Sequence, residues 1–186
     1  MPRNRRPQDR EEKRAEIVAA ARTLFTERGY DAVSVASIAR AAGVVSNTVY
    51  WYFPDKDAVL ISVLDVVLAE SMQRFEAIAG ADLAERLVWV VDELAQLSGL
   101  VTTVHARAEE SAVVRDWHDR FHALTEGLFR LELTELGLAE ADLDAVISMG
   151  VFVIEGLLMH SAARTEQRAV VSALVRSIRG LAVGTA

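Results

Sequence analysis

Apolar residues recur every three or four positions along nearly the whole chain, which is the spacing of one face of an α-helix. No segment alternates apolar and polar residues between turn signals in the manner of a strand. The pattern therefore predicts an all-α protein of about nine helices. The first clear apolar face is made by Ile17, Ala20, Ala21, Leu24 and Phe25.

Turn and capping residues divide the first third of the chain into three helices. Gly29 is placed to end the first one, Ser34 to cap the second and Gly43 to end it. The third helix is predicted at about 45–52, because Pro54 disfavours helical geometry at the residue before it. Longer helices follow, in the approximate ranges 55–80, 82–99, 114–137 and 142–163, and a last one reaches 181. The 142–163 segment is apolar nearly all round, so it must be covered on more than one side.

The third helix lies in a stretch that crowds four aromatic residues together, "GVVSNTVYWYFPDKDAVL" at 43–60. At about 100° per residue, Val45, Val49, Tyr52 and Phe53 fall on one side of this helix. The other side is formed by Ser46, Asn47, Tyr50 and Trp51. A helix this short, anchored on one side and presenting polar and aromatic groups on the other, is typical of a contact surface.

The preceding helix supports a helix-turn-helix, a motif that needs small residues where two steeply crossed helices touch. Ala39 and Gly43 occupy those positions. Lys56 then begins the next helix, where a cation opposes the helix dipole. Either Lys56 shares a backbone phosphate with free amides of that turn, or it is an ordinary solvated lysine.

Charge is unevenly distributed in a chain whose formal net charge is −7. Residues 1–57 carry ten Lys/Arg against eight Asp/Glu, whereas residues 58–186 carry ten against nineteen. The absence of cysteine excludes disulfides and thiolate metal sites. No signal segment and no apolar run of membrane-spanning length is found, so we expect a cytoplasmic protein.

The segment 17–60 resembles the DNA-binding region of the tetracycline-repressor (TetR) family of bacterial transcription regulators. The resemblance rests on Phe25, Gly29, Ile38, Ala39, Gly43, Val44, Thr48, Tyr50, Tyr52, Phe53 and Lys56. One departure is Val45, which stands where the family usually has a serine or similar cap, so the third helix is expected to begin one residue late. The rest of the chain matches the family only in its helical layout.

The resemblance implies a helix-turn-helix domain at 1–55, with residues 1–10 as a flexible basic arm, and a helical effector-binding and dimerisation domain at 56–186. Arg3, Arg5, Arg6 and Arg10 in the arm either follow DNA or form a solvated tail. Ser34 serves either as a cap alone or as a DNA contact. The DNA-contacting set that the family implies is Ser34, Ser37, Arg40, Ser46, Asn47, Thr48, Tyr50, Trp51, Tyr52 and Lys56.

The expected partners are a pseudo-palindromic double-stranded operator, a second copy of the chain and an unknown small-molecule effector. Candidate pocket residues, for which ordinary core packing is the alternative, are Trp89, His105, Trp117, His118, Phe121, His122, Met149, Phe152, Glu155 and Met159. Glu155 lies in an apolar helix, so it needs a His or Arg partner, a raised pKa or a ligand.

His118 and His122 have a zinc-compatible spacing, but the pattern supplies no third ligand, so no metal and no cofactor is expected. No nucleophile elbow or phosphate loop appears. We therefore expect a ligand-released homodimeric repressor that is not an enzyme. The alternative is a helical binding protein or enzyme using His118, His122 and Glu155, with a vestigial N-terminal module.

Overall fold

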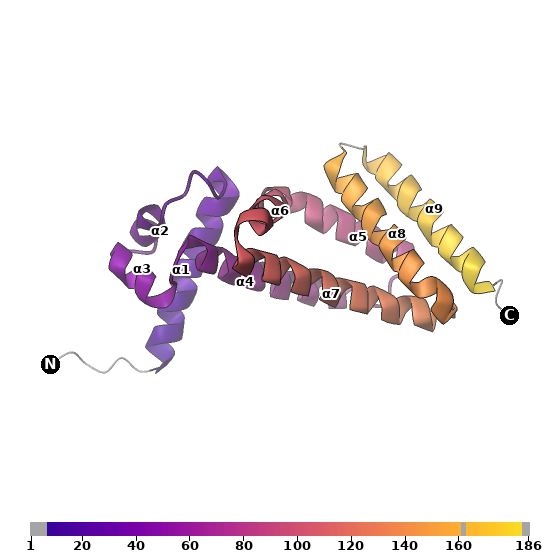
Figure 1. The fold of residues 1–186 in the computed structure, drawn as a ribbon, viewed down its shortest axis with the longest axis horizontal. Coiled ribbons are helices and arrows are strands. Elements are labelled where there is room, and N and C mark those ends of the chain that lie inside the picture. The colour runs from indigo at the N-terminus through magenta and orange to yellow at the C-terminus, as the bar shows by residue number, and fades with distance from the viewer. Residues whose placement is uncertain (1–6, 161–162, 184–186) are drawn as a thin grey trace. The chain divides into compact units, whose positions relative to one another are not determined.

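The computed structural model describes residues 7–160 and 163–183, and over these ranges it contains nine α-helices and no strand (Figure 1). The predicted all-α fold is therefore confirmed. The helices are α1 (Pro7–Arg28), α2 (Val35–Ala41), α3 (Ser46–Tyr52), α4 (Lys56–Glu76), α5 (Leu83–Gln96), α6 (Ser98–Glu110), α7 (Ala112–Glu135), α8 (Glu140–Met159) and α9 (Arg164–Val183).

The chain divides into two compact units. One contains residues 1–70 and 99–118, and the other contains residues 71–98 and 119–186. The first unit thus holds α6 and the beginnings of α4 and α7 as well as the three N-terminal helices. The functional boundary expected at residue 55 stays a prediction, since compactness alone does not define it.

Helix α1 begins earlier than the apolar spacing indicated. Proline is favoured in the first helical turn, and Asp9 adds an acidic residue to that turn, which suits the helix dipole. Arg10 therefore lies within α1, which corrects the expectation of a flexible arm extending to that residue. Arg3, Arg5 and Arg6 lie outside the described residues.

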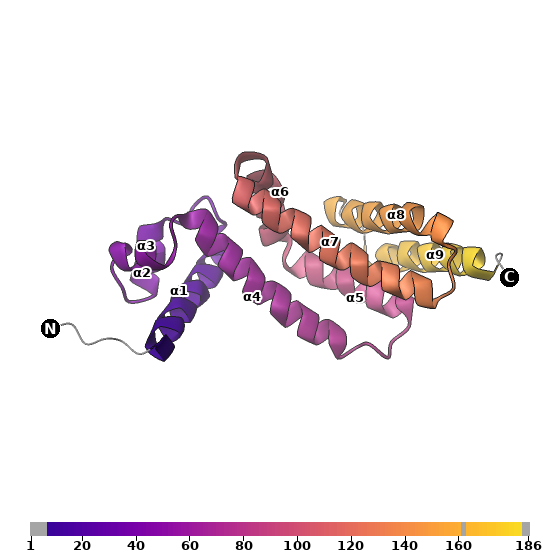
Figure 2. The same cartoon turned by 60° about the horizontal axis from the view of Figure 1, so that its bottom comes forward.

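The first unit has its core under α2 and α3, which pack against each other, and α1 packs on α2 (Figure 2). This core is completely apolar at its centre, where Ile17, Ala21 and Ile38 have no exposed surface. Val59, Leu60 and Val63 from the start of α4 are equally buried. The arrangement gives α3 a rigid support although it is too short to be stable alone.

The second unit is built on α5, α8 and α9, which contact one another pairwise. Asp82 caps α5 and Glu85 completes the predicted capping box. Gly150 allows α8 to approach α7 closely, because a Cβ at that position would lie 2.6 Å from Cε1 of Phe129. The buried core consists of Leu83, Leu87, Val91, Leu133, Leu138, Leu143, Val146, Ile147, Leu157, Val171, Leu174, Val175 and Ile178.

Over the described residues, no single helix has both the length and the apolar character needed to cross a membrane. Helices α5 and α6 meet that criterion only when they are counted together.

Candidate nucleic-acid interface

The turn between α2 and α3 depends on Gly43. Its φ of +66° lies in the left-handed region that glycine adopts without a Cβ penalty. The turn is closed by hydrogen bonds from Val44 N to Ala39 O and from Ala42 N to Ile38 O, both 2.9 Å long. The tight turn predicted from Ala39 and Gly43 is therefore present, and it fixes the direction in which α3 leaves.

One side of α3 is anchored in the core and the other faces solvent, as the helical spacing predicted. Val49 and Phe53 are 1% and 3% exposed, and Tyr52 is half-buried. Val45 was expected on the same side but is 68% exposed, because it stands at the N-cap in extended backbone and not within the helix. On the opposite side, Asn47 is exposed, and Tyr50 and Trp51 keep 53% and 61% of their surface accessible. Large aromatic side chains left in water cost hydrophobic free energy, so their exposure indicates a contact surface.

Helix α3 begins at Ser46, directly after the position where the family usually has its cap, so the expectation that it begins one residue late is wrong. Val45 stands at the N-cap with extended backbone and provides no side-chain hydrogen bond. Valine has no side-chain acceptor, so the first amides of α3 are not capped by it. Ser46 and Thr48 are half-buried at the border of the exposed face.

The serines of α2 are occupied by a capping box. Ser34 Oγ accepts from Ser37 N at 3.1 Å, and Ser37 Oγ accepts from Ser34 N at 3.0 Å. The N-cap role predicted for Ser34 is confirmed, and a DNA contact by either serine stays a prediction. Arg40, in the last turn of α2, is exposed.

Lys56 is held against the loop between α1 and α2. Its ammonium donates to the carbonyl oxygens of Tyr30 and Val33, each at 3.0 Å, and lies 3.8 Å from the centre of the Tyr30 ring. Partial burial lowers the pKa of Lys56. Lys56 is therefore not an ordinary solvated lysine, because two of its three N–H donors are used within the protein. The third donor could still bind a DNA phosphate.

A charged network missed by the sequence reasoning joins Tyr30, Asp57 and Arg107. The Tyr30 hydroxyl donates to Asp57 Oδ1, and Arg107 donates to Asp57 Oδ2 through Nη2 at 2.7 Å and to Oδ1 through Nε at 3.3 Å. This two-point contact joins α6 to the first turn of α4. No sequence signal points to it, because the partners are 27 and 50 residues apart.

The network shifts the ionisation of its members. Burial, followed by the bond to Asp57, raises the pKa of Tyr30. Burial alone would raise the pKa of Asp57, but hydrogen bonds from Arg107, Tyr30 and Ser111 outweigh it and lower that pKa. The hydrogen bond to Asp57 also raises the pKa of Arg107. Asp57 is thus held as an anion.

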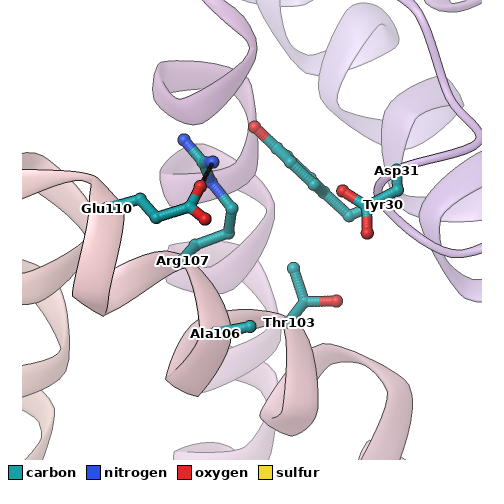
Figure 3. A pocket seen from close by; sticks show the side chains of 6 residues that line it. All are labelled: Tyr30, Asp31, Thr103, Ala106, Arg107 and Glu110. Atoms are coloured by element: carbon teal, nitrogen blue, oxygen red, sulfur yellow. Dashed lines mark hydrogen bonds and ion pairs between the residues drawn. The ribbon is translucent and has the colours of Figure 1, made fainter.

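A polar hollow lies beside this network, and Figure 3 shows its lining side chains. Arg107 Nη1 donates to Glu110, three residues further along α6, at 2.6 Å. The hollow contains none of the residues predicted to bind the effector. It is lined by Tyr30, Asp31, Thr103, Ala106, Arg107 and Glu110.

Three predicted pocket residues lie in the first unit. The rings of His105 and His118 meet edge to face, with centroids 5.0 Å apart. Trp117 is 8% exposed, and its indole nitrogen donates to Asp65 Oδ1 at 2.8 Å. Trp117 is therefore a core residue with a satisfied polar end.

The other pocket candidates lie in the second unit. Trp89 packs against Phe75, and Phe121 against His122, with ring centroids 5.6 and 5.7 Å apart. His122 Nε2 lies 3.9 Å from Glu155 Oε1, so the histidine partner expected for that carboxylate is present.

Three candidates on α8 are turned outward. Met149, Phe152 and Met159 are 38%, 71% and 78% exposed. A helix that is apolar all round does not reveal which side its neighbours cover, so the sequence could not distinguish pocket from surface here. That these three side chains line an effector pocket stays a prediction, and their exposure does not support it.

Two packed helices, a tight glycine turn and a short outward-facing second helix define a helix-turn-helix module of the DNA-binding class. Residues 17–63 match the family model described as bacterial regulatory proteins, tetR family. The match identifies residues 17–63, which contain this helix-turn-helix, as a segment of that family's type.

Individual relatives agree with this assignment. The chain is 33% identical over 133 residues to the HTH-type transcriptional regulator HbdR of Aromatoleum sp. (strain CIB), covering 64% of this chain and 57% of HbdR. It is 32% identical over 99 residues to the HTH-type transcriptional repressor KstR2 of Rhodococcus jostii (strain RHA1), covering 53% of this chain and 45% of KstR2. The chain thus spans about half the length of these curated relatives.

The fold has solved counterparts. A putative transcriptional regulator from Saccharomonospora viridis, crystallised in complex with choline, superposes with a TM-score of 0.74. The superposition covers 89% of this chain and 96% of that chain at 20% identity, so the likeness concerns the fold.

Proposed function

We propose that this protein is a sequence-specific DNA-binding repressor that acts as a homodimer and is released from DNA by a small-molecule effector. The observation that carries the proposal is the exposed face of α3, where Asn47, Tyr50 and Trp51 stand opposite the buried anchors Val49 and Phe53. The family assignment of residues 17–63 supports the same reading. A protein with this function would act on the chromosome, in the cytoplasm.

In this proposal α3 enters the major groove, where each base pair presents a distinct pattern of donors and acceptors. Asn47 and Ser46 hydrogen-bond base edges. Tyr50 packs on sugars or thymine methyl groups, and Thr48 and Arg40 contact phosphates. Lys56 uses two donors to hold the loop before α2, and its third donor is left for a phosphate.

A homodimer follows from the small size of α3. One good base contact gives about 1–3 kcal/mol of discrimination, whereas specific and non-specific binding differ by roughly 4–10 kcal/mol. Two copies reading a pseudo-palindrome supply the difference. The exposed apolar side chains of Met149, Phe152 and Met159 on α8, with Leu181 on α9, are suitable material for the contact between copies.

An effector acts by favouring one state of the dimer. A preference of about 100-fold corresponds to ~2.7 kcal/mol, enough to shift an operator equilibrium substantially. The choline complex of the Saccharomonospora viridis protein supports small organic effectors for this fold. A thermal-shift screen tests the idea with choline and a panel of hydrophobic amines and acids. A binder at 100 times its Kd adds about 2.7 kcal/mol of stability.

Selection from a randomised duplex library tests the proposed function. We expect the wild-type protein to enrich a two-fold symmetric sequence whose half-sites are about one helical turn apart. The enriched duplex should bind about 10³-fold or more tightly than a scrambled one at the same salt. Binding that is equally tight to both duplexes would overturn the sequence-specific reading.

A further inference from the structure

Arg10 of α1 lies directly on the exposed face of α3. Its guanidinium carbon is 4.5 Å from the centre of the Trp51 ring, within the range of a cation–π contact. Both side chains are exposed, so this contact is made at the surface and not in the core. The ring of Trp51 in turn meets Tyr52 edge to face, with centroids 4.7 Å apart, which restricts its orientation.

Three cations lie close together at the start of α1. Lys13 and Arg14 follow Arg10 at three and four residues, so the three cations share a face. Acidic residues flank this face, with Asp9, Glu12 and Glu16 on one side of it and Glu11 on the other. Of these cations, Arg10 and Arg14 each lie against an aromatic ring of the α3 segment, Trp51 and Phe53 respectively.

The other two cations of that face have different tasks. Arg14 donates to Ser62 Oγ at 2.7 Å and lies 5.2 Å from the centre of the Phe53 ring, so it ties α1 to α4 beneath α3. Lys13 forms an ion pair with Glu16. Arg10 is the member of the set that projects along the exposed side of α3.

Stacking on an indole leaves the edge of a guanidinium available. The flat face of arginine contacts the ring, while its five N–H groups point outward in the plane of the group. A side chain already held in one orientation loses less conformational freedom when it binds a partner. The planar fork matches two oxygens of a phosphate.

We propose that Arg10 binds a DNA backbone phosphate at the edge of the groove entered by α3, and that Trp51 is a positioning residue that holds the Arg10 guanidinium in place. This inference rests on the proposed DNA-binding function and adds a specific role for two residues. It also changes the expected role of Trp51, from direct contact with DNA to a platform for a cation.

The test is a double-mutant cycle measured on duplex DNA. Phosphate contacts carry no sequence information, so the probe is a fluorescein-labelled, mixed-sequence duplex of about 30 base pairs. Its affinity is measured from about 50 to about 200 mM NaCl for wild type, Arg10→Ala, Trp51→Leu and the double variant. Thermal unfolding of each variant confirms that these exposed changes leave the fold intact.

We expect Arg10→Ala to weaken binding by about tenfold per bound copy and to reduce the slope of log K against log salt by about 1 per copy. Trp51→Leu should cause most of the same loss, yet less than about twofold further loss when Arg10 is already alanine. Arg10→Lys should keep the salt slope but lose part of the affinity. Trp51→Phe retains a ring and should remain close to wild type.

Arg28→Ala is the matched control, because it removes the same charge from the other end of α1. Arg28 is exposed and lies about 27 Å along the helix axis from Arg10. It should leave the salt slope unchanged. If the wild-type protein binds DNA, two results would overturn this inference. One is an Arg10→Ala variant with the wild-type slope of log K against log salt. The other is a Trp51→Leu change that costs the same affinity whether residue 10 is arginine or alanine. Absence of wild-type binding overturns the proposed function itself.

Discussion

Tyr30 donates its hydroxyl hydrogen to the carboxylate of Asp57, which joins the loop after α1 to the first turn of α4. Arg107, from α6, donates a hydrogen bond to the same carboxylate. Since Lys56 holds the carbonyls of Tyr30 and Val33, adjacent residues of α4 fix both the side chain and the backbone of that loop. The loop leads directly into α2, so this network supports the orientation of the helix-turn-helix.

Asp57→Ala should lower the free energy of unfolding by about 1–3 kcal/mol, because it leaves Arg107 and Tyr30 without their shared acceptor. Urea denaturation followed by circular dichroism measures the change. Glu110→Gln is the matched control: it removes the other, 71% exposed partner of Arg107 and should cost less than about 0.5 kcal/mol. Equal effects of the two changes would show that the network is not a significant support.

Asp57 should also give the protein an acid-sensitive stability. The pKa of Asp57 in the folded protein lies below its ordinary value of 3.8, so its contribution is fully present above that value. The contribution is lost as the pH falls through the lower, folded pKa. Wild type should therefore lose stability more steeply than Asp57→Asn below about pH 4, and parallel curves for the two proteins would contradict the assigned ionisation.

Lys56→Ala should reduce the free energy of unfolding by about 1–3 kcal/mol, because two carbonyls lose a charged donor. Lys13→Ala removes a lysine of the exposed Lys13–Glu16 pair and should have almost no effect. The comparison uses urea midpoints at neutral pH. A Lys56 variant as stable as wild type would contradict the supporting role assigned to its two hydrogen bonds.

The caps and turns of this module could be predicted from the sequence, because they depend on neighbouring residues. Contacts between residues far apart in the sequence could not. Ser34, Gly43 and Asp82 act on neighbouring backbone, so their capping and turn roles could be read from the sequence. The bond from Trp117 to Asp65 spans 52 residues and changes a suspected pocket residue into a core residue. The cation–π contact of Arg10 with Trp51 was likewise hidden, because it requires the packing of α1 beside α3.

Phe152→Glu should shift a homodimer towards monomer. Phe152 is 71% exposed in the single chain, and two-fold symmetry places the change on both copies. Burial of a phenylalanine is worth about 1.5–3 kcal/mol, so the dimer should weaken by about 10²-fold or more. Light scattering after size-exclusion chromatography measures the mass against the 20.4 kDa chain. Ala95→Glu, an exposed position on α5, should leave the mass unchanged, and an unchanged Phe152→Glu would exclude this surface.

The central claim is that the exposed side of α3 is the surface that reads DNA. Its most direct test is the affinity of Asn47→Ala/Tyr50→Ala for the duplex enriched by the wild-type protein, measured by fluorescence anisotropy at one fixed salt concentration. We predict a loss of about 10²-fold or more at unchanged thermal stability, with weak binding to a scrambled duplex largely retained. Unchanged affinity of the double variant for the enriched duplex would contradict the account.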